Sequence, residues 1–459
     1  MAMRTFTAEE IASASGGREI RPSAGPIAGL SLDSRAVKPG MLFAAIRGEK
    51  TDGHGYCAAA AELGASCVLV ERAVEVPEGC GMVLVDSVEL ALRALGRKVR
   101  SDFRGEVVAV AGSCGKTTTK DFTASVLKRL GTVHATSGNR NNLLGLPETL
   151  MGADMDCRFW VLETGISKPM EMGDLAPMAR PTGIVMTTIQ PVHTEFFASL
   201  EAIRDEKAKI FQSAEPGAFG ALNADDPLLK DLRLPSGMER ILYGTSRDAD
   251  LRIEPEGDAG PRGTAFRLHL RGENAQGFLP VTGIHNLLNF AAACAAGVCF
   301  SAPLAQMAEC ASGLQPAAHR GETHLLRGGI LLLDDSYNAN PAAVAAVLTS
   351  ARGWGRRVVG VLGEMLELGP SSARHHETTG FLAAQSGLGA LLAVGEEGAR
   401  VMAEAFAASG RPALHARKWQ DGVQWIEGQI HDGDGVLVKG SRGIGLDGLV
   451  AWLLERKED

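Results

Sequence analysis

A short segment punctuated by glycines is the part of this sequence best suited to chemistry. Residues 112–118 follow the apolar run 106–111 and precede a helical pattern over residues 117–130. Backbone N–H groups at a turn from a strand into a helix bind phosphate, and glycine lets the backbone approach the ligand closely. Lys116 would add a positive charge at the terminal phosphates, and Thr117 a hydroxyl for Mg²⁺. The pattern predicts a nucleotide site made by Gly112, Ser113, Cys114, Gly115, Lys116, Thr117 and Thr118.

This segment is a shortened form of the usual phosphate loop. The full pattern, G-x-x-x-x-G-K-[ST], requires glycine at position 110, where this chain has Val110. The alternative is an ordinary glycine-rich turn, but the strand before it and the helix after it favour nucleotide binding. Cys114 lies near a helix N-terminus, which can lower the pKa of a thiol. Because the loop binds through its backbone, we expect the Cys114 side chain to be incidental.

Polar residues at the ends of predicted strands are candidate metal ligands. Glu163 follows the apolar run 159–162, and His193 follows the run 183–187. Open α/β sheets bind ligands at the carboxyl ends of their strands, so Glu163 is well placed for Mg²⁺. The alternatives are a solvated strand-end glutamate and a structural histidine.

Two further polar groups lie later in the chain. Arg320 precedes the run 332–341, in which two carboxylates and two amides follow a predicted strand. This run is either a ligand-binding edge or a plain Asx-rich turn. Lys207 and Lys209 lie on a predicted helix, where lysines are usually solvated, and their spacing alone nominates neither.

Composition limits the class of protein. The chain has 459 residues, 45% of them hydrophobic and 22% charged, which suggests two to four globular domains. The formal net charge of −8 argues against a nucleic-acid partner. The most apolar stretch, residues 290–300, is too short to cross a membrane and predicts a buried helix. The first ten residues lack a signal peptide, and the eight cysteines show no zinc spacing. We therefore expect a cytoplasmic protein without a membrane span.

Strands that alternate with helices predict an α/β fold of parallel βαβ units. The helical pattern over residues 88–103 ends a first block, and residues 231–283 read as antiparallel strands and loops before a helix at 286–300. Four apolar runs between residues 330 and 438 indicate a second α/β unit. We expect three domains, at residues 1–105, 106–314 and 315–459.

Taken together, these features resemble the Mur ligase family. Five ordered segments, with residues 439–442, carry the resemblance over nearly the whole chain: residues 33–54, 112–118, 138–150, 334–341 and 363–369. The resemblance implies an ATP-dependent amide ligase of bacterial cell-wall precursor synthesis that acts through an acyl phosphate. It implies an N-terminal domain that binds UDP-N-acetylmuramoyl-tripeptide, with Ser34 and Arg35 nearby. It also implies a central phosphate-loop ATPase domain with a mostly parallel sheet, and a Rossmann-like C-terminal domain that helps to bind D-alanyl-D-alanine.

The resemblance also implies roles for single residues at the reacting groups. Glu163 and His193 match the family's Mg²⁺ positions, and Lys207 matches a lysine that becomes carbamylated and helps to hold a second Mg²⁺. Lys116, Lys207 and His193 are thus the candidate catalytic residues. Thr117, Glu163, His193 and Lys207 are the candidate metal ligands.

Other matching positions concern the nucleotide and the substrates. Asn286 and Asn289 match the adenine-side motif, Arg320 a phosphate-contacting arginine, and Asp335 the ribose-side carboxylate. Asn338 is a candidate substrate contact. Cys114 replaces the family's common asparagine, and residues 443–447 also depart from the family pattern.

Two other classes stay open at this point. One is a different amide ligase of the superfamily, such as a folylpolyglutamate synthase or an earlier Mur ligase. The folate enzyme lacks a domain like residues 1–105, and the run 334–341 argues against the diaminopimelate- or lysine-adding ligase. The other is a non-catalytic nucleotide-binding regulator, although Glu163 and His193 are both present. We expect a monomer.

Overall fold

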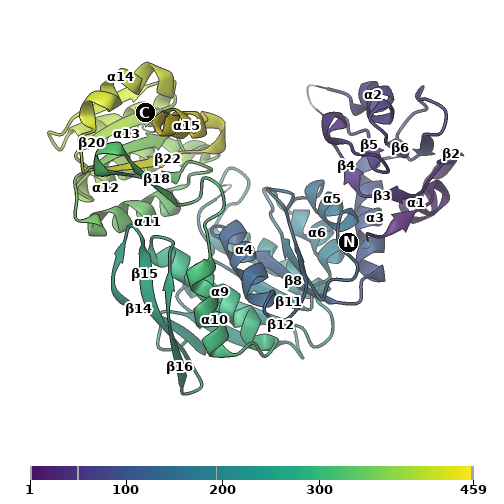
Figure 1. The fold of residues 1–459 in the computed structure, drawn as a ribbon, viewed down its shortest axis with the longest axis horizontal. Helices are drawn as coiled ribbons and strands as arrows, with labels where there is room; N and C mark the ends of the chain where they lie inside the picture. Colours follow the sequence, from purple (N-terminus) through teal and green to yellow (C-terminus); the bar gives the residue numbers. More distant parts are fainter. Residues whose placement is uncertain (1–2, 49–50, 193, 456–459) are drawn as a thin grey trace.

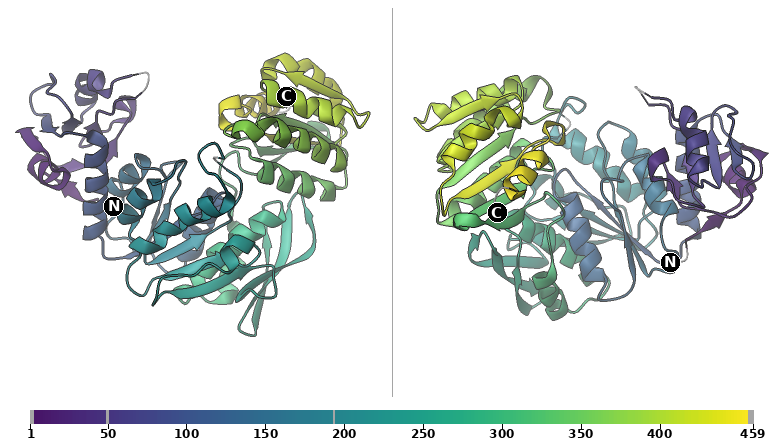
Figure 2. Two further views of the ribbon diagram at one scale, coloured as in Figure 1. Left: turned by 180° about the vertical axis from the view of Figure 1, so that it is seen from behind. Right: turned by 45° about the horizontal axis from the view of Figure 1, so that its top comes forward.

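The protein folds into three α/β units that follow one another along the chain. The structure, a computed structural model, describes residues 3–48, 51–192 and 194–455. The N-terminal and C-terminal units lie at opposite ends of the central unit (Figure 1). The view from behind and the tilted view show the same open arrangement (Figure 2). The predicted three-domain α/β fold is therefore confirmed. The boundaries after residues 105 and 314 stay predictions.

The N-terminal unit is built on a sheet with strand order β2-β7-β6-β5-β4, parallel except for β2. A capping box starts its first helix, because Thr7 Oγ1 accepts from the Glu10 N–H while Glu10 accepts from the Thr7 N–H. The predicted helix at 88–103 is confirmed as α3. The elements are β1 (Thr5–Phe6), α1 (Ala8–Ser15), β2 (Arg18–Arg21), β3 (Ile27–Ala28), β4 (Leu30–Ser31), β5 (Leu42–Ala44), α2 (Cys57–Glu62), β6 (Cys67–Val70), β7 (Gly81–Leu84) and α3 (Val88–Asp102).

The central unit contains a sheet with strand order β16-β15-β14-β13-β12-β11-β8-β10-β9. It is parallel from β9 to β14 and antiparallel at β15 and β16. Its strands are β8 (Glu106–Ala111), β9 (Val133–Ala135), β10 (Phe159–Glu163), β11 (Gly183–Met186), β12 (Phe219–Asn223), β13 (Glu239–Gly244), β14 (Leu251–Gly260), β15 (Gly263–Leu270) and β16 (Glu273–Leu279). Its helices are α4 (Lys116–Leu127), α5 (Gly145–Met151), α6 (Glu171–Ala179), α7 (Leu200–Ala208), α8 (Pro227–Lys230), α9 (Ile284–Cys299) and α10 (Leu304–Cys310).

The prediction for residues 231–283 was wrong in part. Strand β13 pairs in parallel with β12, and only β14, β15 and β16 form antiparallel pairs. The end of β13, residues 241–244, is buried, so this strand belongs inside the sheet rather than in an irregular segment.

The C-terminal unit has a sheet with strand order β17-β18-β22-β19-β20-β21, parallel except for the edge strand β17. The four strands predicted here are confirmed as β18, β19, β20 and β22. The elements are β17 (Glu322–Leu326), β18 (Ile330–Asp335), α11 (Pro341–Ala351), β19 (Val358–Gly363), α12 (Ser372–Gln385), β20 (Ala390–Val394), α13 (Glu397–Ala407), β21 (Ala413–Ala416), α14 (Trp419–Gln429), β22 (Gly435–Lys439) and α15 (Asp447–Glu455).

Helix α9 forms much of the core beneath the central sheet. Residues 290–296 are fully buried, which confirms the helix predicted from this apolar stretch. The helix packs against α4 and against several strands of the sheet. Burying a side chain the size of Phe290 contributes about 2 kcal/mol, so α9 provides a firm support for the residues at its N-terminal end. In the part of the chain that the structure describes, no helix is long and apolar enough to cross a membrane.

Candidate nucleotide and metal site

Two glycines allow the loop at residues 112–118 to pack closely against its surroundings. Gly112 has φ +137° and Gly115 φ +78°, conformations that favour glycine. A Cβ at Gly112 would lie 2.0 Å from Thr187 Oγ1, and one at Gly115 would lie 2.3 Å from Asn289 Oδ1. Helix α4 starts within the loop at Lys116, and no side chain caps its first N–H groups. The loop therefore presents the N-terminal end of a helix to an anion, as its sequence predicted.

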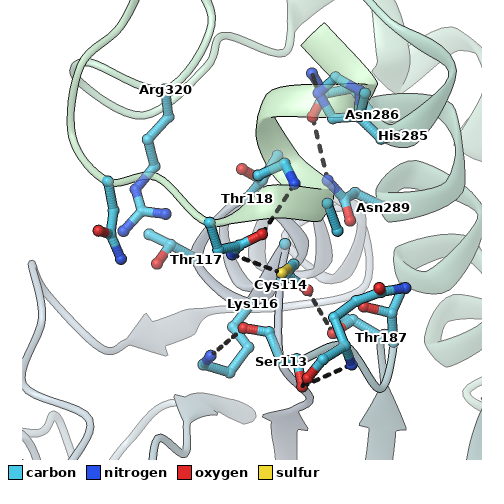
Figure 3. A pocket seen from close by; sticks show the side chains of 18 of the residues that line it. Ser113, Cys114, Lys116, Thr117, Thr118, Thr187, His285, Asn286, Asn289 and Arg320 are labelled. Carbon is cyan, nitrogen blue, oxygen red and sulfur yellow. Dashed lines mark hydrogen bonds between the residues drawn. The ribbon is translucent and has the colours of Figure 1, made fainter. Parts of the chain in front are cut away.

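The loop forms one wall of a pocket between the central and C-terminal units. Figure 3 shows the loop, the start of α9 and Arg320 around this pocket. The lining residues are Ser113, Cys114, Gly115, Lys116, Thr117, Thr118, Asn139, Asn141, Glu163, Thr187, Thr188, Gln190, Asn223, Tyr243, His285, Asn286, Leu288, Asn289, Arg320, Asp335, Tyr337, Asn338, Asn340, Ala342, Ala343, Ala346 and Lys439.

The side chains of Lys116 and Cys114 both form hydrogen bonds at the loop. Lys116 Nζ donates to the Ser113 carbonyl oxygen at 3.0 Å. Burial lowers the pKa of Lys116, and Arg320 adds to this effect, while Glu163 and Cys114 oppose it. Cys114 Sγ accepts from Asn340 Nδ2 at 3.1 Å. This thiol therefore contacts the C-terminal unit, while the expectation that the Cys114 side chain is incidental to nucleotide binding stays a prediction.

Glu163 has the environment of a cation ligand. It ends β10 next to β8, in register with Val110, and is 2% exposed. One oxygen, Oε1, accepts from Asn141 Nδ2 at 2.7 Å. The other, Oε2, is buried and has no hydrogen-bond partner among the described residues. A buried carboxylate oxygen without a donor is costly, and a bound cation would remove that cost. Mg²⁺ prefers oxygen ligands, so this residue fits the predicted metal.

Lys207 is buried, contrary to the usual expectation for a lysine on a helix. It lies near the end of α7 and is 2% exposed. Burial, with repulsion from Lys116, lowers its pKa from the usual 10.5 to about 7. Its neighbour Lys209 is partly exposed and pairs with Glu206 at 2.5 Å. The environment thus singles out Lys207 as an amine that is readily deprotonated at neutral pH.

Two asparagines link α9 to the phosphate-loop helix. Asn289 Oδ1 accepts from Thr119 Oγ1 at 3.2 Å, and Asn289 Nδ2 donates to Asn286 Oδ1 at 3.1 Å. Asn286 Nδ2 donates to the Thr282 carbonyl at 2.8 Å. These bonds hold both predicted nucleotide residues at the pocket wall. His285, which also lines the pocket, was not singled out from the sequence.

The C-terminal unit supplies the opposite wall. Lys439 Nζ forms an ion pair with Asp335 Oδ2 at 2.6 Å and donates to the Asn338 carbonyl at 2.9 Å. Arg320 lies over the Tyr337 ring, with its Cζ 4.0 Å from the centroid. Sequence reasoning gave no role to Tyr337, Asn340 or Lys439, although all three lie in segments that carry the family resemblance. The contacts of Lys439 join residues more than 100 positions apart, and spacing does not reveal them.

Of the predicted site residues that the structure describes, Ser34, Arg35, Gly112 and Lys207 do not line this pocket. Ser34 and Arg35 lie in a short 3₁₀ turn of the N-terminal unit, where Arg35 pairs with Asp33 at 2.8 Å. The described pocket lining contains no residue of that unit. His193 lies outside the described residues, and its neighbour Thr194 donates through Oγ1 to the Leu368 carbonyl of the C-terminal unit at 3.2 Å.

Comparison with known families identifies this arrangement. The chain matches the Mur ligase family catalytic domain over residues 26–110, the Mur ligase middle domain over residues 110–297 and the Mur ligase glutamate ligase domain over residues 319–442. The chain belongs to the Mur ligase family. The phosphate loop, Glu163 and Lys207 lie in the segment matched by the middle domain, and Arg320 and Lys439 in that matched by the glutamate ligase domain.

Relatives that align over nearly their full length show which members of the family this chain resembles. The UDP-N-acetylmuramoyl-tripeptide--D-alanyl-D-alanine ligase of Bacillus subtilis strain 168 is 31% identical over 434 residues, which is 94% of this chain and 93% of that protein. A crystal structure of MurF from Acinetobacter baumannii superposes with a TM-score of 0.88 at 26% identity, covering 99% of this chain and 100% of that one. MurF from Thermotoga maritima, solved in complex with ADP, has a TM-score of 0.81 at 25% identity and covers 93% and 97%.

Proposed function

We propose that this chain is an ATP-dependent ligase that joins D-alanyl-D-alanine to UDP-N-acetylmuramoyl-tripeptide, with release of ADP and phosphate. One observation carries the proposal. The phosphate loop faces Arg320, Asp335 and Lys439 across a single pocket, in a chain aligned almost end to end with a UDP-N-acetylmuramoyl-tripeptide--D-alanyl-D-alanine ligase. A nucleotide-binding regulator would not need the unpartnered carboxylate oxygen of Glu163 or the buried amine of Lys207.

The chemistry requires activation of a carboxylate. A carboxylate oxygen of the tripeptide attacks the γ-phosphorus of ATP, the bond from that phosphorus to the ADP oxygen breaks, and an acyl phosphate forms. The dipeptide amine then attacks the acyl carbon, and phosphate leaves with the former carboxylate oxygen. Lys116 and Arg320, both lining the pocket, would offset negative charge on the transferred group.

Glu163 and Thr117 are the described residues that would hold Mg²⁺. Both line the pocket and both are nearly buried, and the free Oε2 atom of Glu163 supports this role. His193 is the further proposed ligand, and the modified Lys207 would serve a second Mg²⁺. When bound, Mg²⁺ supplies positive charge to the phosphate oxygens. The chain's own part is to orient Glu163 through the Asn141 amide.

Lys207 is proposed to carry a carbamate. Only an unprotonated amine attacks CO₂, and a pKa of about 7 makes a large part of this amine available at neutral pH. The unprotonated nitrogen bonds to the carbon of CO₂, one C=O bond opens to C–O⁻, and the nitrogen loses a proton, so a neutral amine becomes an anionic carbamate. Counted from the ammonium form of the lysine, two protons are lost. That change would replace the repulsion between Lys207 and Lys116 with attraction.

Chemical rescue tests this assignment. Lys207→Ala should lose most of its activity, and short carboxylic acids should restore part of it by occupying the vacated space. Full activity without any added acid would show that no carbamate is needed.

We assign the substrates to different structural units of the chain. Ser34 and Arg35 would lie near the UDP end of the nucleotide-sugar peptide, and Asn338 near the reacting substrates. We propose that the protein is active as a monomer, in the cytoplasm where ATP is available.

A matched set of amine substrates tests which reaction the protein catalyses. Purified protein is given ATP, Mg²⁺ and UDP-N-acetylmuramoyl-tripeptide with D-alanyl-D-alanine, D-alanine or L-alanyl-L-alanine, and products are identified by mass spectrometry. We expect a pentapeptide product only with D-alanyl-D-alanine. Phosphate release that does not depend on an amine, or product formation only from the dipeptide precursor and a diamino acid, would contradict the proposed substrates.

A further inference from the structure

The chain between the central and C-terminal units makes an unusual turn at His319. This residue has φ +61°, in the left-handed region, which is uncommon for a residue with a side chain. Arg320 follows it directly and reaches the nucleotide pocket. A backbone held in this region needs contacts that stabilise it.

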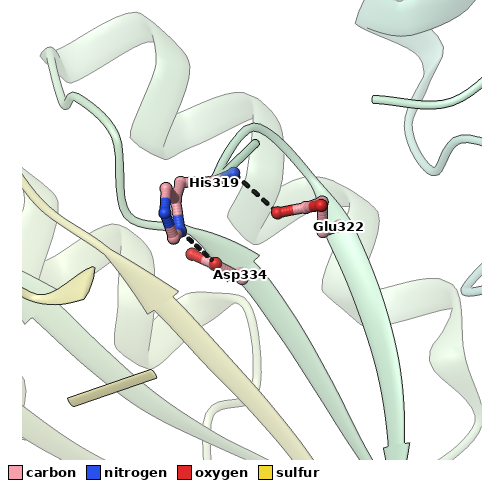
Figure 4. Close-up of side chains that lie close together, drawn as sticks. All are labelled: His319, Glu322 and Asp334. Carbon is pink, nitrogen blue, oxygen red and sulfur yellow. Dashed lines mark hydrogen bonds and ion pairs between the residues drawn. The ribbon is translucent and has the colours of Figure 1, made fainter. Parts of the chain in front are cut away.

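Three polar groups of His319, its ring Nδ1, its backbone N–H and its carbonyl, are bonded to the C-terminal unit. Its ring Nδ1–H donates to Asp334 Oδ2 at 2.6 Å, and its backbone N–H donates to Glu322 Oε2 at 2.7 Å. Its carbonyl accepts from the Tyr337 N–H at 3.0 Å. Figure 4 shows the histidine between the two carboxylates at the ends of their strands.

Asp334 is itself held firmly. It is 1% exposed, and its other oxygen accepts from the N–H and the hydroxyl of Ser336 at 3.0 and 2.6 Å. Its carbonyl accepts from the Gly321 N–H at 2.8 Å. The residues on both sides of Arg320 are thus bonded to Asp334. One nitrogen or oxygen atom of each of the side chains of His319, Glu322 and Asp334 lies within 4.8 Å of the other two, and the hydrogen bonds from His319 to both carboxylates stabilise the turn.

We propose that His319 is a positioning residue for Arg320. Its bonds to Asp334 and Glu322 hold the left-handed turn, and the turn directs the Arg320 side chain over Tyr337 and into the pocket. The proposal rests on the proposed function in one respect, since the pocket must bind adenine nucleotide.

Three substitutions separate the effect of the His319 side-chain N–H from the effect of its left-handed backbone conformation. His319→Asn keeps a side-chain N–H at the same distance from the backbone and tolerates the left-handed region. His319→Gly keeps only the backbone freedom, and His319→Ala keeps neither. We expect the affinity of the full chain for MgADP to fall in the order wild type, Asn, Gly, Ala, with Asn within about threefold of wild type and Ala about tenfold weaker.

A double-mutant cycle shows whether His319 acts through Arg320. Arg320→Ala should weaken MgADP binding, and adding His319→Ala to it should cause no further loss. Losses that multiply in the double variant would overturn the proposal, as would a folded His319→Asn no better than His319→Ala. If His319→Ala does not fold, His319→Gly takes its place in the cycle.

His415 gives a matched control. Its ring Nε2 bonds to the Gly395 carbonyl at 2.9 Å in the same unit, but it does not line the pocket. His415→Ala should leave MgADP binding unchanged, and an equal loss there would show a general structural effect. Wild-type protein that binds MgADP but makes no pentapeptide would refute the proposed function and leave this inference standing.

Discussion

Replacing Lys207 with methionine should stabilise the fold while it removes activity. Lys207 is 2% exposed, and burial lowers its pKa from 10.5 to about 7. Folding must either remove the proton from this lysine or bury its charge. Either change lowers the free energy of unfolding. Methionine has a similar length and no charge, so Lys207→Met removes that cost with little change in packing.

The size and sign of the effect follow from proton linkage. Between pH 7 and 10.5 the unfolded chain binds more protons at Lys207 than the folded chain does, so stability rises with pH in that window. The lowering of the pKa of Lys207 from 10.5 to about 7 corresponds to a cost of roughly 4 kcal/mol at pH 7 that falls to about 1 kcal/mol at pH 10. The gain in stability from Lys207→Met should shrink accordingly.

Urea unfolding in buffers free of CO₂ measures this difference, because the amine then stays unmodified. The free energy of unfolding of Lys207→Met is compared with wild type at pH 7 and pH 10, and phosphate release is assayed on the same samples. Lys128→Met is the control, since Lys128 is exposed on the same central unit and should show no pH-dependent difference. A variant less stable than wild type at pH 7, or a gain that is equal at both pH values, would refute the reasoning.

Three other substitutions test the remaining parts of the pocket. Lys116→Ala should abolish ATP-dependent phosphate release, as measured by a coupled phosphate assay, and near-wild-type turnover would remove the loop from the mechanism. Gly115→Ala should prevent MgADP binding in calorimetric titration, because its Cβ would lie 2.3 Å from Asn289 Oδ1 on a backbone with φ +78°; unchanged affinity would contradict the described packing. Lys439→Met should raise the KM for ATP and destabilise the chain by roughly 3 kcal/mol, because it breaks a nearly buried ion pair with Asp335; unaltered kinetics and unfolding would show that the pair does not support the site.

Much of the fold was readable because its determinants are local. After Glu106 the run 107–111 is apolar and buried, which suits a strand buried on both faces, and the glycines at 112 and 115 mark the turn that follows. Strand β13 was misjudged because it begins with two exposed charged residues, Glu239 and Arg240, and only its second half is buried. It pairs in parallel with β12, and the local sequence pattern does not show that these two strands pair.

The site was predictable where a motif is continuous in sequence, and not where it depends on packing. Lys207 and Lys209 have the same residue type and nearly the same position, yet only Lys207 faces the core. Cys114 and Asn340 meet across 226 positions. No periodicity or spacing in the chain encodes such contacts, because they arise only when the central and C-terminal units pack together.

The central claim is that this pocket turns a carboxylate into an acyl phosphate. The most direct measurement uses UDP-N-acetylmuramoyl-tripeptide labelled with ¹⁸O in the reacting carboxylate, together with ATP, Mg²⁺ and D-alanyl-D-alanine. The account predicts that each phosphate released carries one ¹⁸O atom from that carboxylate, in step with formation of the pentapeptide. Pentapeptide formed together with unlabelled phosphate would contradict it, because the carboxylate oxygen would then never have bonded to phosphorus.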